Sequence, residues 1–241
     1  MTSDTHDFVV GVDACSGGWF ATILFEDSVS TSLYDDFENL VEDFADSTRI
    51  LVDIPIGLPT SERRRCDERA KELLGCRGIS VFYPPCEAAI ECDDYETANK
   101  IHEDTMDYGL SQQAHNIGDA IRDVAAVVDD EYDGLIRESH PELCFYALNG
   151  QPIAYSKSSD RGQAMRTQLL QETLNGMEAS RKDARKSYLV KDVSDDDILD
   201  SMALAIAARA TTLRTVPETP DNNEPRIYYP EPRSRFGLGS V

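Results

Sequence analysis

The first quarter of the chain alternates between apolar runs and short polar turns, in the pattern of a small sheet. Residues 8–14 and 49–55 are apolar and rich in β-branched side chains, which is typical of buried strands. The short gap between 8–14 and 19–26 favours a hairpin, and 28–34 continues as a third, more polar strand. Residues 35–45 carry apolar side chains at the spacing of a surface helix. This β-β-β-α-β order predicts an α/β fold with a mixed five-stranded sheet, in the order 3-2-1-4-5, whose second strand is antiparallel to its neighbours.

The remainder of the chain has mostly helical periodicity. A fifth strand is expected over 134–139, and helices are expected over 61–74, 96–105, 110–128, 141–150, 161–192 and 194–214. We therefore predict one domain over 1–214, in which helices flank the sheet and 61–133 is a mostly helical insertion. Residues 215–241 contain five of the eleven prolines, so we expect an extended Pro-rich C-terminal tail.

The composition adds a strongly acidic surface to this picture. Lys and Arg together number 23 against 45 Asp and Glu, which gives a net charge of −22. Abundant Asp and scarce Lys are typical of proteins from a high-salt cytoplasm, where hydrated carboxylates maintain solubility. No apolar run reaches the ~18 residues of a membrane helix, and no signal sequence precedes residue 8. We expect a cytoplasmic, halophilic protein without a membrane partner. Molar salt shortens the Debye length to about 3 Å, so the net charge does not exclude nucleic acid.

Several carboxylates lie at the ends of otherwise apolar elements. Asp13 ends the first strand, Asp53 lies near the end of the fourth, and Glu138 ends the fifth. Asp197 and Asp200 stand three residues apart at the start of the last helix, on neighbouring faces. Charges in such positions are costly unless they are paired, hydrogen-bonded or bound to a metal. Converging carboxylate oxygens favour Mg²⁺ or Mn²⁺.

Seven segments together resemble domain-of-unknown-function family 429. In chain order they are GVDACSGGW, VDIPIGLP, ERRRCDERA, ISVFYPP, LSQQAHNIGDAIRDV, ESHPELCF and DDDILDSMALAIAA. That family is described as predicted nucleases with an RNase H-like fold, and the resemblance runs from about residue 9 to 210. The same fold begins β-β-β-α-β, in agreement with the hydrophobic pattern. The last segment also resembles the final helix of Holliday-junction resolvases, in which two acids three apart complete a metal site.

The resemblance implies a role for each acid. Asp13 would bridge two metal ions, Asp53 would be the acid of the fourth strand, and Asp200, helped by Asp197, the acid of the last helix. Glu138 is the fifth catalytic candidate; it begins an E-x-H-P-E element whose chemical role the resemblance leaves open. Structural alternatives stand beside these roles. Asp13 could form a turn, Asp53 could cap a loop, and the first-turn acids of the last helix could complement its dipole.

A basic cluster follows Asp53 in the sequence. We expect it to contact phosphates beside the metal site, since Arg suits bidentate phosphate contacts. Its members are Arg63, Arg64, Arg65 and Arg69. His140 could serve as a proton shuttle or contact substrate, although a His before Pro at a strand-to-helix turn is as often a helix cap.

Three classes of function fit these observations. The leading hypothesis is a Mg²⁺- or Mn²⁺-dependent nuclease that hydrolyses nucleic-acid phosphodiester bonds by a two-metal mechanism. The alternative is a non-catalytic nucleic-acid- or nucleotide-binding regulatory module that keeps the RNase H-like fold. A phosphotransferase of the sugar-kinase or actin kind shares this sheet topology but needs two such domains and a second phosphate loop. The sequence has neither, which disfavours that class.

Overall fold

A mixed five-stranded sheet forms the centre of the protein. The computed structural model describes residues 7–128, 132, 134–221 and 224–233. The strands are β1 (Val9–Cys15), β2 (Gly18–Leu24), β3 (Val29–Tyr34), β4 (Arg49–Val52) and β5 (Ile136–Glu138). Their order is β3-β2-β1-β4-β5, with β2 antiparallel to β1 and β3, and β4 parallel to β1 and β5. The predicted fold class and strand order are therefore confirmed.

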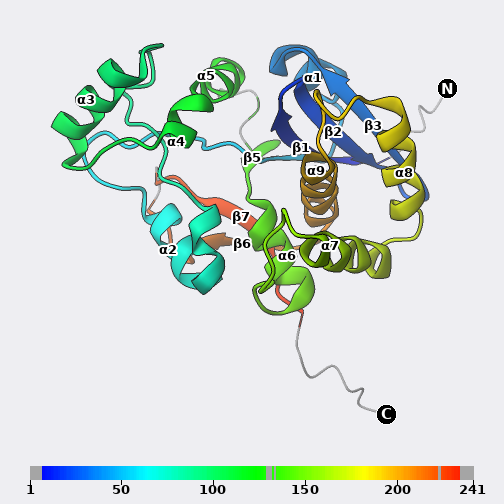
Figure 1. Cartoon of the computed structure of the whole chain (residues 1–241). Coiled ribbons are helices and arrows are strands. Elements are labelled where there is room, and N and C mark those ends of the chain that lie inside the picture. Colours follow the sequence, from blue (N-terminus) through cyan, green and yellow to red (C-terminus); the bar gives the residue numbers. More distant parts are fainter. Residues whose placement is uncertain (1–6, 129–131, 133, 222–223, 234–241) are drawn as a thin grey trace.

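Helices cover both faces of this sheet (Figure 1). Along the chain they are α1 (Phe37–Asp43), α2 (Arg65–Leu74), the 3₁₀ helix η1 (Gly75–Ser80), α3 (Tyr95–Met106), α4 (Gln112–Asn116), α5 (Gly118–Val127), α6 (Pro141–Asn149), α7 (Asp160–Thr173), α8 (Met177–Ser187) and α9 (Asp195–Ala208). Helices α6 to α9 contribute to one core layer, and α1 and α5 contribute to the other. Among the described helices, none is long and apolar enough to span a membrane.

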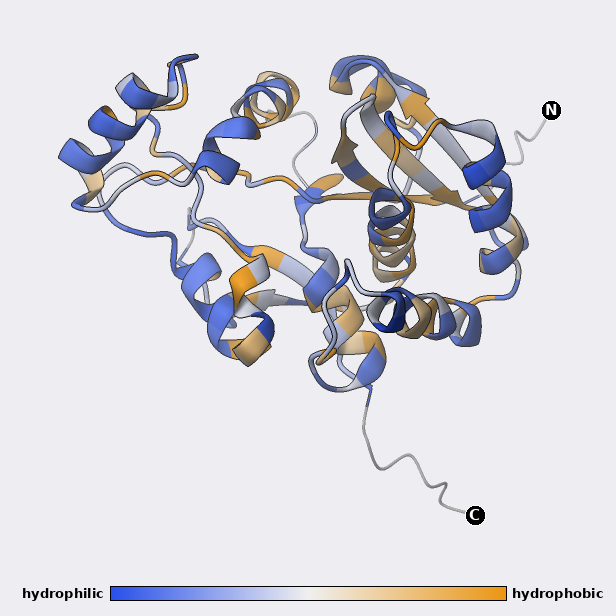
Figure 2. Cartoon of the chain, viewed as in Figure 1, coloured by the Kyte–Doolittle hydropathy of each residue, from blue (hydrophilic) through white to orange (hydrophobic). Residues whose placement is uncertain are grey.

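The alternation of side chains along each strand divides the core into these two layers. Val10 and Val12 of β1 pack toward α1 and α5, whereas Val9 packs with Phe20 and Leu51 on the side of α9. Both faces are apolar, so the central strands are buried on both sides. In Figure 2 these strands carry much of the apolar colour, while α3, far from the sheet, is largely hydrophilic.

Two of the predicted helices are interrupted. The segment 110–128 contains α4 and α5, which meet at Ile117, and 161–192 contains α7 and α8. Helix α7 ends at its C-cap Leu174, whose backbone is extended, and Gly176 precedes α8 in a left-handed conformation with a φ of 92°. Helical periodicity alone misses the second break because α7 and α8 both keep an apolar face toward the same core.

The C-terminal region corrects the expectation of an extended tail. Strands β6 (Leu213–Val216) and β7 (Ile227–Pro230) form a separate antiparallel sheet. Val216, Ile227 and Tyr229 are buried together with apolar residues of α2 and α6. Tyr228 also forms a parallel bridge with Ser139, just beyond β5. The prolines lie in and around this hairpin and do not prevent it, because only short stretches are paired. The expected tail beyond residue 233 lies outside the described residues.

Candidate metal site

A close approach of α9 to β1 builds the site. Gly11 faces α9, and a Cβ added there would lie 2.7 Å from the backbone carbon of Leu204 and closer still to other backbone atoms of α9. Only a residue without a side chain allows this packing. A buried hydrogen bond of 2.8 Å between the Thr22 and Ser201 hydroxyls fixes α9 against the sheet. These contacts position α9 along β1. The close approach at Leu204 lies about one helical turn from Asp200.

Asp13, Asp53 and Asp200 converge at this junction. Val12 and Val52 are partners in the parallel β1–β4 pair, so Asp13 and Asp53 emerge side by side from strands about 4.8 Å apart. Asp13 alternates with Gly11 and therefore lies on the α9 side of the sheet, as Asp53 does by its alternation with Leu51. Asp200 reaches the same place from α9. We refer to these three residues as the carboxylate triad.

The triad is held at an electrostatic cost. Asp13 is 7% and Asp200 3% exposed. Burial, followed by repulsion from Asp53 and Asp200, raises the pKa of Asp13 well above its usual value. Burial likewise raises the pKa of Asp53, and it raises the pKa of Asp200 to about 6. Lys157 opposes all three shifts. The triad is therefore short of positive charge.

The triad opens into a cavity of about 250 Å³ between the sheet and the helical insertion. Ile79, Ser80, Val81 and Phe82 from the end of η1 line one wall, together with Ile227 of β7. The E-x-H-P-E element contributes further lining residues. These are Glu138, Ser139, His140, Pro141 and Glu142. Strand ends, the insertion and the C-terminal hairpin thus share one concave site, the usual setting of a ligand-binding site.

Glu138 lies apart from the triad, although it lines the same cavity. It pairs in register with Val52 on β4 and so points to the opposite face of the sheet. Its carboxylate forms an ion pair with Arg64 and accepts a hydrogen bond of 2.7 Å from the Ile56 amide. Burial raises the pKa of Glu138 to about 7. These contacts give Glu138 a role in holding the loop after β4 and the start of α2.

Asp197 is turned toward the start of its own helix. Ser194 and Asp197 form a capping box, in which the Asp197 carboxylate accepts from the Ser194 amide at 2.7 Å. Asp197 lines a neighbouring hollow with Cys15 and Asp35 and does not line the triad cavity. The structural alternative raised for the first-turn acids therefore describes Asp197. Asp195, another acid of the first turn, has a carboxylate oxygen 3.4 Å from the Arg185 guanidinium.

The predicted basic cluster is divided among separate contacts. Arg64 is 4% exposed and bonded to Glu138, which corrects its expected role in substrate binding. Arg65 pairs with Glu224 at 2.9 Å, and Arg69 pairs with Glu72 at 2.5 Å. Arg63 is exposed and stacks on two tyrosine rings. Its guanidinium carbon lies 4.4 Å from the centre of the Tyr83 ring and 4.2 Å from the centre of the Tyr108 ring. Only Arg65 and Arg69 belong to α2, whereas Arg64 is its N-cap and Arg63 precedes it, so the four residues do not share one helix face.

His140 and Glu142 organise the loop that enters α6. The His140 ring accepts a hydrogen bond of 3.1 Å from the Glu142 amide, so His140 is the N-cap of α6. Glu142 is buried and forms ion pairs with Arg77, at 3.2 Å, and with Arg166 of α7. The E-x-H-P-E element therefore connects the strand end to the insertion on one side and to α7 on the other.

Among the described residues, a group other than the triad brings its potential ligand atoms closest together, and a guanidinium already lies among them. Cys66, Asp67 and Glu138 have ligand atoms within 4.8 Å of one another. The Arg64 guanidinium lies among them, 3.0 Å from the Cys66 sulfur and 3.2 Å from Asp67. The positive charge there is supplied by the chain itself, which makes this group a buried ion-pair network.

Lys157 is the site residue that sequence reasoning missed. It belongs to the stretch 151–160, between two predicted helices, which has the polar composition of an ordinary loop. Its ammonium donates to Asp200 Oδ2 at 2.8 Å. The scarcity of Lys in this chain was the available signal, since only six are present.

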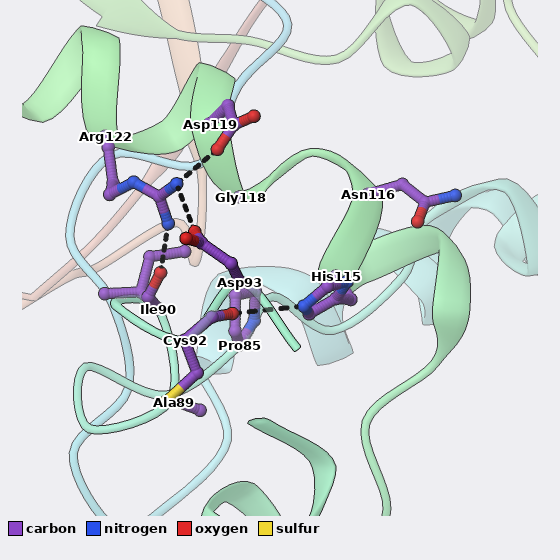
Figure 3. A pocket seen from close by; sticks show the side chains of 10 residues that line it. All are labelled: Pro85, Ala89, Ile90, Cys92, Asp93, His115, Asn116, Gly118, Asp119 and Arg122. Atoms are coloured by element: carbon purple, nitrogen blue, oxygen red, sulfur yellow. Dashed lines mark hydrogen bonds and ion pairs between the residues drawn. The ribbon is translucent and has the colours of Figure 1, made fainter. Parts of the chain in front are cut away.

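Another hollow lies in the insertion, away from the triad (Figure 3). Its charged groups satisfy one another: Arg122 contacts the Ile90 carbonyl, Asp119 and Asp93. His115 approaches the Cys92 carbonyl at 3.1 Å. No cluster of buried carboxylates is found among its lining residues, all of which are described. The triad cavity is the better candidate for chemistry.

The fold and the triad together define an α/β protein with an RNase H-like sheet order and acids gathered at the carboxyl ends of its central parallel strands. The chain belongs to DUF429, a family of proteins of unknown function, whose model matches residues 11–224. The family resemblance expected from the seven segments is thus confirmed. Neither the curated proteins nor the solved structures gave a match.

Proposed function

We propose that this protein is a metal-dependent phosphodiesterase that cleaves nucleic acid. The convergence of Asp13, Asp53 and Asp200 from three separate elements carries the proposal. Evenly spread surface acids would not explain three carboxylates that share one buried corner. A stabilising reason is needed for such a cluster, and a divalent cation supplies one.

The donor set fits Mg²⁺ or Mn²⁺. All three side chains offer hard carboxylate oxygens, and burial is the main reason that their pKa values are raised, a cost that a bound cation would offset. Asp13 interacts electrostatically with both Asp53 and Asp200 and is the candidate bridging ligand in a two-metal site. Bound divalent cations would activate water and stabilise the leaving oxygen of a phosphodiester. Asp13, Asp53 and Asp200 would act as ligands, and none would need to accept the proton of the attacking water.

Residues of the insertion and of the E-x-H-P-E element would position the substrate. Arg63 and its two tyrosine neighbours offer a cationic and aromatic surface on the insertion, suited to a phosphate or a base. His140 lines the cavity with its ring already fixed by the Glu142 amide. Glu138 would support the site through Arg64. This arrangement predicts cleavage that depends little on sequence, because it positions the backbone without reading base edges.

The acidic surface sets the conditions for the test. With a net charge of −22, the protein would repel a polyanion at low ionic strength. We propose a high-salt cytoplasm as its setting, where this repulsion is screened. Because unscreened repulsion weakens substrate binding in dilute buffer, an assay at low ionic strength alone would underestimate the activity.

The test is a cleavage assay in molar KCl. Single-stranded DNA, duplex DNA, RNA, an RNA–DNA hybrid and a branched junction are each incubated with Mg²⁺, Mn²⁺ or EDTA. We expect cleavage with the metals and none with EDTA or in Asp13→Asn. Asp195→Asn is the matched control, because it removes an acid outside the triad. If the protein binds Mn²⁺ tightly but cleaves neither these nucleic acids nor a small phosphodiester, the proposed phosphodiesterase activity is wrong. That result would favour the non-catalytic binding module.

A further inference from the structure

Lys157 occupies the position at which a cation would meet Asp200. Its ammonium lies 2.8 Å from Asp200 Oδ2, and its side chain is 44% exposed where that of Asp200 is 5% exposed. Lys157 thus reaches from the solvent edge into the buried triad. Its charge also acts on Asp13 and Asp53. One ammonium faces three carboxylates, so it can neutralise only part of the site.

The loop that carries Lys157 is firmly anchored on its N-terminal side. Ile153 is 1% exposed within the main core. The Arg166 guanidinium donates to the Tyr155 carbonyl at 3.3 Å and to the Gly162 carbonyl at 3.1 Å. Arg166 also forms the buried ion pair with Glu142. The E-x-H-P-E element is therefore connected through Arg166 to the loop that presents Lys157.

The loop is equally constrained on its C-terminal side. Ser159 caps α7 through the Gly162 amide, and its own amide donates to the Ser156 carbonyl at 3.1 Å. A Cβ on Gly162 would lie 2.8 Å from the Ser156 carbonyl carbon and closer still to its oxygen. Lys157 thus follows the tightly packed Ser156, so its main chain has little freedom to move away from the edge of the cavity. Only its flexible side chain can move.

A cation bound by Asp200 would compete with this ammonium. Carboxylate oxygens that coordinate a metal are less available to a nearby ammonium, which is then repelled by the like charge. The anchored loop would keep the displaced ammonium at the cavity mouth. A phosphate that approaches the triad enters at that point, and lysine is a common phosphate ligand.

We propose that Lys157 is a substrate-binding residue that is released by metal binding. It neutralises Asp200 in the metal-free protein, yields Asp200 to the divalent cation, and then contacts the phosphate of the substrate. This inference rests on the proposed metal-dependent function and extends it to the order of binding: the metal first, then the phosphodiester.

The first measurement is calorimetric titration of Mn²⁺ into the substrate-free protein in molar KCl. Lys157→Met should bind Mn²⁺ about tenfold more tightly than wild type, equivalent to about 1.4 kcal/mol, since no ammonium has to be displaced. Lys157→Arg, which keeps a charge at this place, should bind more weakly than Lys157→Met. Lys186→Met is the matched control, because Lys186 forms an equally short pair of 2.8 Å with Asp183 on the exposed surface.

The second measurement is binding of a short phosphorothioate DNA at saturating Mn²⁺. Here Lys157→Met should bind at least fivefold more weakly than wild type or Lys186→Met. Opposite effects on metal and DNA affinity are the signature of the proposed exchange, and a purely structural salt bridge would not produce them. Melting curves with and without Mn²⁺ check folding, and Lys157→Gln replaces Lys157→Met if the latter does not fold.

The outcomes separate the two proposals. If Asp13→Asn loses Mn²⁺ binding but Lys157→Met matches wild type in both titrations, the inference about Lys157 is wrong and the metal site stands. Tighter Mn²⁺ binding with unchanged DNA binding would also overturn it, because the substrate contact would be missing. If neither wild type nor Lys157→Met binds Mn²⁺, both proposals fail.

Discussion

Replacing Gly11 by alanine tests how the triad is assembled. A Cβ at this position would lie 2.7 Å from the Leu204 backbone carbon, whereas ordinary contact begins at 3.4 Å, a deficit of about 0.7 Å. The obstructing atoms belong to the α9 backbone and cannot rotate away. Helix α9 must therefore move off β1, and Asp200 must move away from Asp13.

The expected cost follows from this geometry. Overpacking a dense core costs typically about 1–3 kcal/mol, and the upper end applies because backbone atoms clash. We expect Gly11→Ala to lose about 3 kcal/mol of unfolding free energy, which leaves a domain of ordinary stability folded. Its Mn²⁺ affinity should also fall, because displacing α9 changes the distances within the triad.

The assay is urea unfolding in molar KCl, monitored by circular dichroism. The Mn²⁺ titration is carried out on the same variants. Gly118→Ala is the control, since a Cβ there meets its nearest neighbour, Ile90, at an ordinary 3.6 Å. That change should be neutral or stabilising, because alanine favours the helix. If Gly11→Ala unfolds at the wild-type urea concentration and binds Mn²⁺ normally, α9 does not depend on this close approach and the account of the site is wrong.

Three further predictions follow from the charges around the cavity. Asp13→Asn should abolish Mn²⁺ binding while leaving the metal-free protein as stable as wild type or more so, because it relieves repulsion in the triad; unchanged Mn²⁺ affinity would exclude Asp13 as a ligand. Burial raises the pKa of Asp200 to about 6 in the folded state, above the ordinary value of 3.8, so between these pH values the folded state binds more protons than the unfolded state. The unfolding free energy of metal-free wild type relative to Asp200→Asn should thus decrease as pH rises from 4 to 6 in paired urea titrations, and a difference that increases would contradict this. Arg64→Met should lower the unfolding free energy by about 3–5 kcal/mol, because it leaves Glu138 buried without its partner. Asp197→Ala should lower it by only about 1 kcal/mol, the contribution of a helix cap, and should retain Mn²⁺ affinity. Loss of Mn²⁺ binding in Asp197→Ala would restore Asp197 as a ligand.

The sheet and the triad could be predicted because their signals are local. Strands β1 and β4 are short apolar runs that end in Asp13 and Asp53, and a single rule about parallel neighbours brings those ends together. The position of Asp200 among buried residues of α9 was also readable from the helical period. These features depend on periodicity, which any correct fold must satisfy.

The partners of long charged side chains could not be predicted in this way. Arg64 and Arg65 are adjacent in the sequence, yet one is buried against Glu138 and the other pairs with Glu224 near β7. Lys157 lies in a loop without periodicity, and its contact with Asp200 spans forty-three positions of the chain. Such choices depend on which elements meet in three dimensions. The C-terminal hairpin was missed for a related reason, since its strands are short and gain their burial from α2 and α6.

The contact between α9 and β1 also has a consequence for synthesis. The Thr22–Ser201 hydrogen bond joins residues 179 positions apart, so the sheet face that holds Val9, Phe20 and Leu51 lacks α9, one of the helices that cover it, until most of the chain has been synthesised. Contacts of such separation form slowly, and an uncovered apolar face favours association of nascent chains. We therefore expect chains stalled before α9 to be the species that chaperones must bind. The triad, completed by the same helix, is then among the last features of the protein to form.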